Sequence, residues 1–310
     1  MSELILHHYS TSPFSEKTRL MLGYKGLSWR SVTIAPIMPK PELTALTGGY
    51  RKTPVLQIGA DIYCDTALIA RQLEHSKALP SLFPDDCAFA AAILAAWADS
   101  TLFQHAVAFV FQPESLALRF AKAPPELFKA FVADRRKLFE GGNATRVSIE
   151  QARNQWPVFM ARLEQQLAHR GDFLFGQPSI ADFAVAHPLW FLRQTPVTAP
   201  WVEQYPEVLA WLARVEGFGH GSFSAMTGVE ALDVALGSEP AALPDKGLEV
   251  SDDVRIGQQV SVSAEDYGVD PVVGQLMFLG EEELIVRREE ERTGVVHVHF
   301  PRLGFRVSAV

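Results

Sequence analysis

A serine at the predicted start of the first helix has the residue type and position that best suit chemistry. Ser12 is followed by Pro13, the residue favoured at the first helical position, so Ser12 is predicted to be the N-cap of a helix that runs to about Lys25 and stops at Gly26. A helix N-terminus carries unpaired N–H groups and a partial positive charge. A hydroxyl there can donate to a thiolate and lower the thiol pKa from about 8.5 towards neutrality. The simpler interpretation, in which Ser12 only caps the helix, stays open.

Two further turns have features of a peptide-binding site. Pro54 opens an apolar run, which is unusual for an interior strand because proline cannot donate to the ladder. A cis Thr53–Pro54 bond would explain this and would leave the Thr53 backbone free to pair with an extended peptide. Asp65 or Thr66 begins another helix, whose N–H groups can hold a carboxylate while Asp65 accepts from an ammonium; plain capping is the alternative. Together the turns predict a site for a small zwitterionic thiol peptide.

The elements that position these residues fall into three zones. In residues 1–84, short apolar runs alternate with helical patterns, which predicts an α/β unit. Residues 87–237 are predicted to form an all-helical domain, broken at prolines and glycines. Residues 238–247 have the composition of a linker. In residues 248–310 the apolar period changes to two, which predicts a small all-β module shaped as a compact barrel.

Composition and charge exclude several classes of protein. The 310 residues are 48% hydrophobic and 21% charged, which excludes disorder as the main state. The net charge of -8 and the lack of a dense basic stripe argue against nucleic-acid binding. Cys64 and Cys87 have neither disulfide nor metal-ligand spacing. The apolar stretch Ala88–Phe111 is interrupted by Asp99 and other polar residues, so we expect a buried helix and no membrane span. No basic, apolar leader opens the chain, and we expect a cytoplasmic protein.

In order and spacing, the three turns resemble the N-terminal, thioredoxin-like domain of the cytosolic glutathione transferases, in the serine-type form found in bacteria. A second match lies downstream, where Phe175–Val185 resembles the N-capping box of the family's helical domain. There Ser179 is predicted to cap a helix and Asp182 to reach back to it, a role in folding and not in catalysis. The module after residue 247 has no counterpart in the usual two-domain pattern.

The resemblance implies a role for each matching residue. Ser12 would contact the glutathione sulfur, Thr53 would pair with the cysteinyl backbone, and Asp65 and Thr66 would bind the γ-glutamyl end. Either Lys40 or Lys52 would meet the glycyl carboxylate. Ser12 stands where some relatives have a cysteine, and because a hydroxyl cannot form a mixed disulfide, mixed-disulfide chemistry is not expected. The predicted glutathione-binding residues are Ser12, Phe14, Lys40, Lys52, Thr53, Pro54, Asp65 and Thr66.

Other side chains are weaker candidates. Tyr9 and Ser15 are alternative hydroxyls for the thiol, and Tyr9, Trp97 and Phe103 are candidates to line an apolar acceptor pocket, although core packing would also account for these aromatics.

A pair of histidines lies in the last zone. His297 and His299 fall on one face of a predicted strand, a spacing that can bind a metal. No third ligand is evident from the sequence. We therefore expect a solvated strand face and no metal.

The sequence therefore predicts a glutathione-dependent transferase of the detoxification type, in which glutathione thiolate attacks a small, largely apolar electrophile. The resemblance also implies a homodimer, with the thioredoxin-like domain of one chain against the helical domain of the other. The alternatives are another glutathione-using enzyme, such as an isomerase or thiol reductase, and a non-catalytic binding or scaffold protein in which the β module recruits a partner. No metal, nucleic acid or membrane is expected to take part.

Overall fold

The computed structural model describes residues 3–248 and 254–310. Residues 1–2 of the predicted N-terminal domain and residues 249–253 of the predicted module lie outside these ranges. The N-terminal unit is a mixed sheet with helices packed on it. β1 pairs in parallel with β2 and antiparallel with β3, and β3 pairs antiparallel with β4. This is the predicted α/β unit. Its elements are β1 Leu4–His8, α1 Pro13–Tyr24, β2 Ser28–Thr33, α2 Pro41–Thr47, β3 Val55–Ile58, β4 Asp61–Cys64 and α3 Thr66–Ser76.

The first helix begins and ends where the sequence predicts. Ser12 is its N-cap, with extended backbone angles, and Pro13 is its first residue. Gly26 has a φ of +56°, the left-handed conformation that ends a helix without the steric cost of a side chain. The end of β1 and the start of α1 therefore hold Ser12 beyond the carboxyl end of β1.

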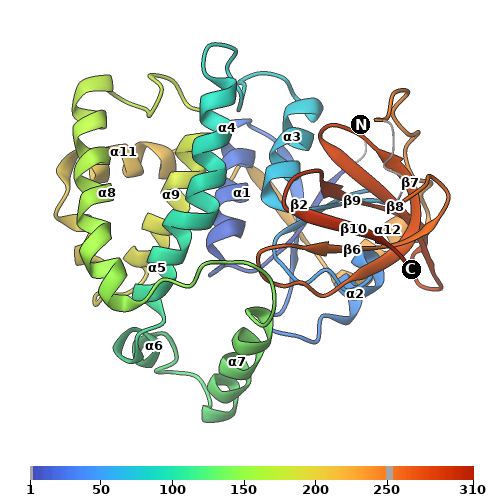
Figure 1. Cartoon of the computed structure of the whole chain (residues 1–310), viewed down its shortest axis with the longest axis horizontal. Helices are drawn as coiled ribbons and strands as arrows, with labels where there is room; N and C mark the ends of the chain where they lie inside the picture. The colour runs from blue at the N-terminus through green and yellow to red at the C-terminus, as the bar shows by residue number, and fades with distance from the viewer. Residues whose placement is uncertain (1–2, 249–253) are drawn as a thin grey trace.

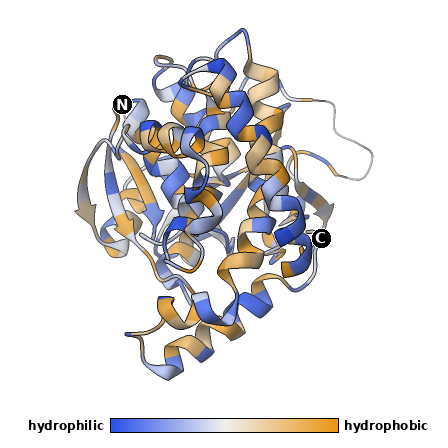
Figure 2. Cartoon of the chain, turned by 90° about the vertical axis from the view of Figure 1, so that its left-hand side faces the viewer, coloured by the Kyte–Doolittle hydropathy of each residue, from blue (hydrophilic) through white to orange (hydrophobic). Residues whose placement is uncertain are grey.

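The helical unit packs against α1 through α9 and shares a hydrophobic core with α3, on one side of the N-terminal sheet (Figure 1). In Figure 2 hydrophobic and hydrophilic residues alternate around these helices, as expected for helices with one buried face. The predicted capping box is confirmed: Asp182 accepts from the backbone N–H of Ser179 at 2.9 Å. The helices are α4 Ala88–Trp97, a π-helical turn Ala98–Leu102, α5 Phe103–Val110, α6 Pro113–Arg119, α7 Pro125–Leu138, α8 Ile149–Arg170, α9 Ile180–Arg193, α10 Pro200–Glu203 and α11 Pro206–Glu216.

The long apolar stretch forms one continuous helix, from α4 through the π-helical turn to α5. By length and composition alone, Ala88–Val110 would suffice to cross a membrane. Here it packs against α8 and α9, and 56% of its most apolar window is buried inside the protein. Its polar residues also have partners inside the protein: the imidazole of His105 is 2.7 Å from the side-chain oxygen of Gln155. These contacts agree with the prediction of a helix within a folded domain.

After α11 the chain returns to the N-terminal sheet. β5, Ser222–Met226, pairs in parallel with β2, and α12, Gly228–Leu236, packs against α2 and β9. Residues 222–236, which the predicted division places in the helical domain, thus lie on the first unit.

The C-terminal module is rich in strands, as predicted, and it continues the N-terminal sheet. β9 pairs in parallel with β4, so that the sheet runs in the order β10-β6-β7-β8-β9-β4-β3-β1-β2-β5. The module is therefore not a separate sheet: its strand β9 pairs with β4 and covers the edge of that strand. Its strands are β6 Gln259–Ala264, β7 Val272–Leu279, β8 Glu283–Glu290, β9 Gly294–Pro301 and β10 Phe305–Ala309.

One hydrophobic core joins the module to the N-terminal unit. Leu43 and Tyr50, from the α2 region, and Ile62 of β4 are buried in the same cluster as the inward side chains of the module strands. Phe300 is fully buried there, with its ring centroid 6.0 Å from that of Tyr50. The two units are therefore packed as one body and are not joined by the linker alone.

Candidate active site

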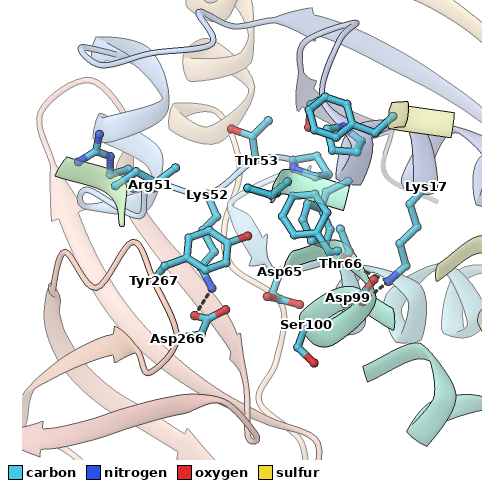
Figure 3. A pocket seen from close by; sticks show the side chains of 18 of the residues that line it. Lys17, Arg51, Lys52, Thr53, Asp65, Thr66, Asp99, Ser100, Asp266 and Tyr267 are labelled. Atoms are coloured by element: carbon cyan, nitrogen blue, oxygen red, sulfur yellow. Dashed lines mark hydrogen bonds and ion pairs between the residues drawn. The ribbon is translucent and has the colours of Figure 1, made fainter. Parts of the chain in front are cut away.

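The predicted site residues line one large cavity, of about 880 Å³. Its walls come from the N-terminal unit, from α4 to α7, and from the module (Figure 3). All eight residues predicted to bind glutathione line it, together with Tyr9 and Phe103. The eight residues, from Ser12 to Thr66, are thus brought to one cleft at the end of β1 and the starts of α1 and α3.

Ser12 is buried but reaches the cavity, with 3% of its surface exposed. Its Oγ accepts the backbone N–H of Ser15 at 3.2 Å, and within the described residues its own O–H has no acceptor. That proton is therefore available to a ligand. The side chain of Ser15 is fully buried and does not line the cavity, so it is not placed to contact a bound thiol. Tyr9 lines the cavity and remains an alternative to Ser12.

A buried network fixes the turn that carries Ser12. The guanidinium of Arg19 donates to the carbonyls of Tyr9 and Ser10, at 3.3 and 3.0 Å, and forms an ion pair with Glu16. Glu16 also accepts from the imidazole of His220 at 2.9 Å, and these two partners help to hold the pKa of its carboxyl below the ordinary value despite burial. The chain after α11 thereby helps to hold the turn.

The predicted cis geometry of the Thr53–Pro54 bond is confirmed. Within the described residues, the backbone of Thr53 has no hydrogen-bond partner, and its side chain accepts from Lys40 Nζ at 2.9 Å. An extended peptide would therefore find a free N–H and C=O at this position.

Asp65 and Thr66 open α3 at the far side of the cleft. Asp65 is its N-cap, with a φ of +76° and a carboxylate that accepts from Ala67 N–H at 2.9 Å. It is the sole non-glycine residue with positive φ in the described ranges, a costly conformation that tends to occur at functional sites. Burial raises the pKa of its carboxyl, and the ammonium of Lys52 opposes that shift.

Three residues that the sequence analysis did not assign to the site hold this side of the cavity together. Lys17 Nζ lies 3.2 Å from Thr66 Oγ1 and 2.5 Å from an oxygen of Asp99, and His187 contacts the other oxygen of Asp99 at 2.9 Å. Asp99 is in the π-helical turn, a distortion that is common at functional sites. The one available signal was an acidic residue inside an apolar helix.

The two lysines predicted to be candidates for the glycyl carboxylate have different surroundings. Lys52 Nζ is 2.5 Å from the carboxylate of Asp266 and 4.4 Å from the ring centroid of Tyr267, both in the module (Figure 3). Lys40 has no acidic partner within the described residues. Burial, with repulsion from Arg135, lowers the pKa of Lys40 to about 8. Of the two lysines, Lys40 is therefore the one without a carboxylate partner in the part of the chain that the structure describes.

The apolar half of the cavity lies beside Ser12. Phe14 and Phe103 meet edge to face, with ring centroids 4.7 Å apart, and both line the cavity. Trp97 does not line it: its ring faces α8, where it packs against Phe159 at 5.4 Å. Phe103 lies six residues after Trp97, beyond the π-helical turn, so the two rings point to different sides of the same helix.

The module supplies a wall that the sequence did not reveal. Its loop after β6 brings Asp266 and Tyr267 to the cavity, and Leu303 and Gly304 line it from the β9–β10 turn. Backbone bonds fix this loop: Gly268 N–H donates to the carbonyl of Leu138, at the end of α7, at 2.7 Å.

Comparison with known proteins identifies the family. Residues 6–81 match the model of the glutathione S-transferase N-terminal domain, and residues 146–214 match that of the C-terminal domain. A crystal structure of a GST-like protein from Pseudomonas syringae is 58% identical in sequence, covers 100% of both chains and superposes with a TM-score of 0.85. The chain belongs to the glutathione S-transferase family. Because that protein is matched over its whole length, the match includes the β module.

More distant members share the fold. A glutathione S-transferase from Rhodospirillum rubrum F11 is 20% identical, with a TM-score of 0.53, and covers 69% of this chain and 87% of its own. One from Methylobacillus flagellatus KT, with glutathione bound, is 22% identical, with a TM-score of 0.50 over 70% of this chain and 99% of its own. No curated protein matches the chain.

Proposed function

We propose that this transferase-family protein joins glutathione to small, largely apolar electrophiles. The observation that carries the proposal is the joining of three features in one cavity: the free Ser12 hydroxyl, the unpaired Thr53 backbone and the apolar wall that contains Phe14 and Phe103. The first two suit a thiol peptide, and the third suits an apolar acceptor.

In the proposed reaction, the glutathione thiol loses its proton to solvent. The Ser12 O–H donates to the thiolate, and the partial positive charge at the start of α1 stabilises it further. The sulfur then attacks the electrophilic carbon, a C–S bond forms, and the leaving group departs with its electron pair. A low thiol pKa raises the fraction of nucleophile at neutral pH.

The rest of the tripeptide is assigned by charge. The Thr53 backbone would pair with the cysteinyl residue, Asp65 would accept from the γ-glutamyl ammonium, and the N–H groups at the start of α3 would hold its carboxylate. Lys40 would bind the glycyl carboxylate. Lys52, already paired with Asp266, would shape the cleft without binding that carboxylate.

Lys40→Met is expected to raise the KM for glutathione about tenfold or more near pH 7, because a charge-assisted hydrogen bond contributes about 1.5–3 kcal/mol. In the native protein, KM should rise as pH increases through about 8, where the free Lys40 ammonium loses its proton. The variant should lose this pH dependence. Steady-state kinetics at saturating electrophile measures both effects.

Lys52→Met is the matched control, since the same charge is removed from the same cleft. Its effect on KM should be several times smaller than that of Lys40→Met. If Lys52→Met has the larger effect, the assignment of the two lysines is reversed.

The proposed function is tested by titrating glutathione into the native protein and following thiolate ultraviolet absorbance against pH. A thiolate that forms near neutrality supports the transferase. Binding with no shift of the thiol pKa supports a passive binding protein, and no binding supports a scaffold.

We also propose that the protein works as a homodimer, as its family resemblance implies. Phe89 and Ile93, one turn apart on α4, are 81% and 56% exposed and offer an apolar surface for a partner. Light scattering after gel filtration should give twice the chain mass; a mass of one chain would contradict this.

A further inference from the structure

A cluster of three metal-ligating side chains lies where the module joins the N-terminal sheet, among residues that do not line the cavity. The parallel pairing of β4 with β9 places Asp61 opposite His297 and Tyr63 opposite His299. The side chains of Asp61, His297 and His299 are 5%, 8% and 4% exposed. The expectation of a solvated strand face is therefore wrong: the ring of His299 stacks on that of Tyr63, with centroids 4.3 Å apart, and His297 lies against Asp61.

The distances within the cluster suit a small cation. Asp61 Oδ1 is 3.0 Å from His299 Nε2 and 3.9 Å from His297 Nδ1, and one ligand atom from each residue lies within 4.8 Å of the other two. Ligands about 2.0–2.1 Å from a tetrahedral zinc ion are about 3.3 Å apart. The observed separations bracket that value.

The remaining atoms of two ligands already have partners that orient them. Glu283 Oε2 is 2.8 Å from His299 Nδ1, and Asp61 Oδ2 accepts the backbone N–H of Ala241 at 2.9 Å. This leaves His299 Nε2 and Asp61 Oδ1, which lie 3.0 Å apart, as the two atoms that an ion would bind in place of their mutual hydrogen bond. A carboxylate behind a histidine ligand is the usual second layer of a zinc site, since it fixes the tautomer and raises ligand basicity.

The third ligand carries an independent sign of a missing partner. His297 Nδ1 is buried and, within the described residues, makes no hydrogen bond. Buried polar atoms are nearly always satisfied in native proteins. A metal ion between His297 and Asp61 would satisfy this nitrogen, whereas the hydrogen bonds of His299 do not reach it.

We propose that Asp61, His297 and His299 bind a zinc ion that ties the β module to the N-terminal sheet. Two imidazoles and one carboxylate suit zinc better than calcium or magnesium, which prefer oxygen ligands. Three protein ligands leave a fourth position for water. The ion links β4 to β9 and so stabilises the unit that supplies Asp266 and Tyr267 to the cavity.

The test uses the full chain, stripped with a chelator and titrated with Zn²⁺, with bound metal measured by elemental analysis. We expect one equivalent per chain, a higher melting temperature with zinc, and the intense visible absorption of tetrahedral Co²⁺ when cobalt replaces zinc. His297→Gln and Asp61→Asn should weaken binding by more than about 100-fold, and Glu283→Gln by about 10- to 100-fold.

His75→Gln is the matched control, because His75 is exposed on α3, outside the cluster; it should bind zinc as the native protein does. The proposal is overturned if the native protein takes up no zinc. It is also overturned if the His297→Gln variant, shown by circular dichroism to be folded, binds zinc as tightly as the native protein does. The first result needs no variant, so it stands even if a variant fails to fold. Glutathione binding by the stripped protein is measured separately, which keeps this outcome distinct from that of the transferase proposal.

Discussion

Ser12→Ala is expected to lower kcat/KM for an activated aryl chloride by about 10- to 100-fold near pH 6.5. The variant removes one hydrogen bond to the thiolate, which contributes about 1.5–3 kcal/mol when one partner is charged. Each 1.36 kcal/mol corresponds to one pKa unit, so the pKa of bound glutathione should rise by about one to two units. The loss should shrink towards high pH, where the thiol ionises without help. Rates from about pH 6 to 9, with thiolate absorbance of the bound peptide, measure both effects.

Two variants control this experiment. Ser15→Ala removes a neighbouring hydroxyl that is buried away from the cavity, and it keeps the backbone N–H that donates to Ser12; its kinetics should stay close to native. Tyr9→Phe removes the other hydroxyl-bearing candidate at the cavity. If Tyr9→Phe produces the pH-dependent loss and Ser12→Ala does not, Tyr9 is the residue that stabilises the sulfur.

Local signals were sufficient to predict the turns of the site. The Ser12–Pro13 start of α1, the cis bond before Pro54 and the Ser179 capping box each depend on residues at most three positions apart. At that range, side-chain chemistry and backbone geometry are directly coupled, so a single sequence carries the information.

The pairings between distant segments could not be predicted in the same way. Nothing in the sequence around Lys52 indicates Asp266, which lies 214 positions later and is brought near by the docking of the module. Likewise, Asp61 completes the histidine cluster only because β4 pairs with β9 in a particular register. The alternation of Val296 to Phe300 predicts a strand but leaves open what covers its second face.

The position of the module could not be predicted either, because it also depends on pairing between distant segments. Alternating apolar residues predict strands, and composition predicts a linker before them, but the strands of a separate module and strands that extend another sheet have the same pattern along the chain. The difference lies in β4, whose edge is free for pairing in a two-domain arrangement and is occupied by β9 here.

Phe300→Ala is expected to lower the free energy of unfolding by about 3–5 kcal/mol, the usual cost of removing a buried phenylalanine side chain. Phe300 is fully buried between Tyr50 of the N-terminal unit and Phe305 of β10, with ring centroids 6.0 and 5.5 Å away. The cavity would therefore weaken both units. Urea unfolding should shift as a single transition, whether it is followed by far-ultraviolet circular dichroism or by tryptophan fluorescence.

Leu303→Ala is the control from the next turn, because Leu303 is 86% exposed and its truncation should change stability by less than about 0.5 kcal/mol. A module that is joined to the N-terminal unit by the linker alone would respond differently to Phe300→Ala. Its strands would unfold first, in a separate transition, and the N-terminal unit would keep its native stability. Coincident transitions at lower urea are expected instead, because Leu43, Tyr50 and Ile62 lose packing partners together with the module strands.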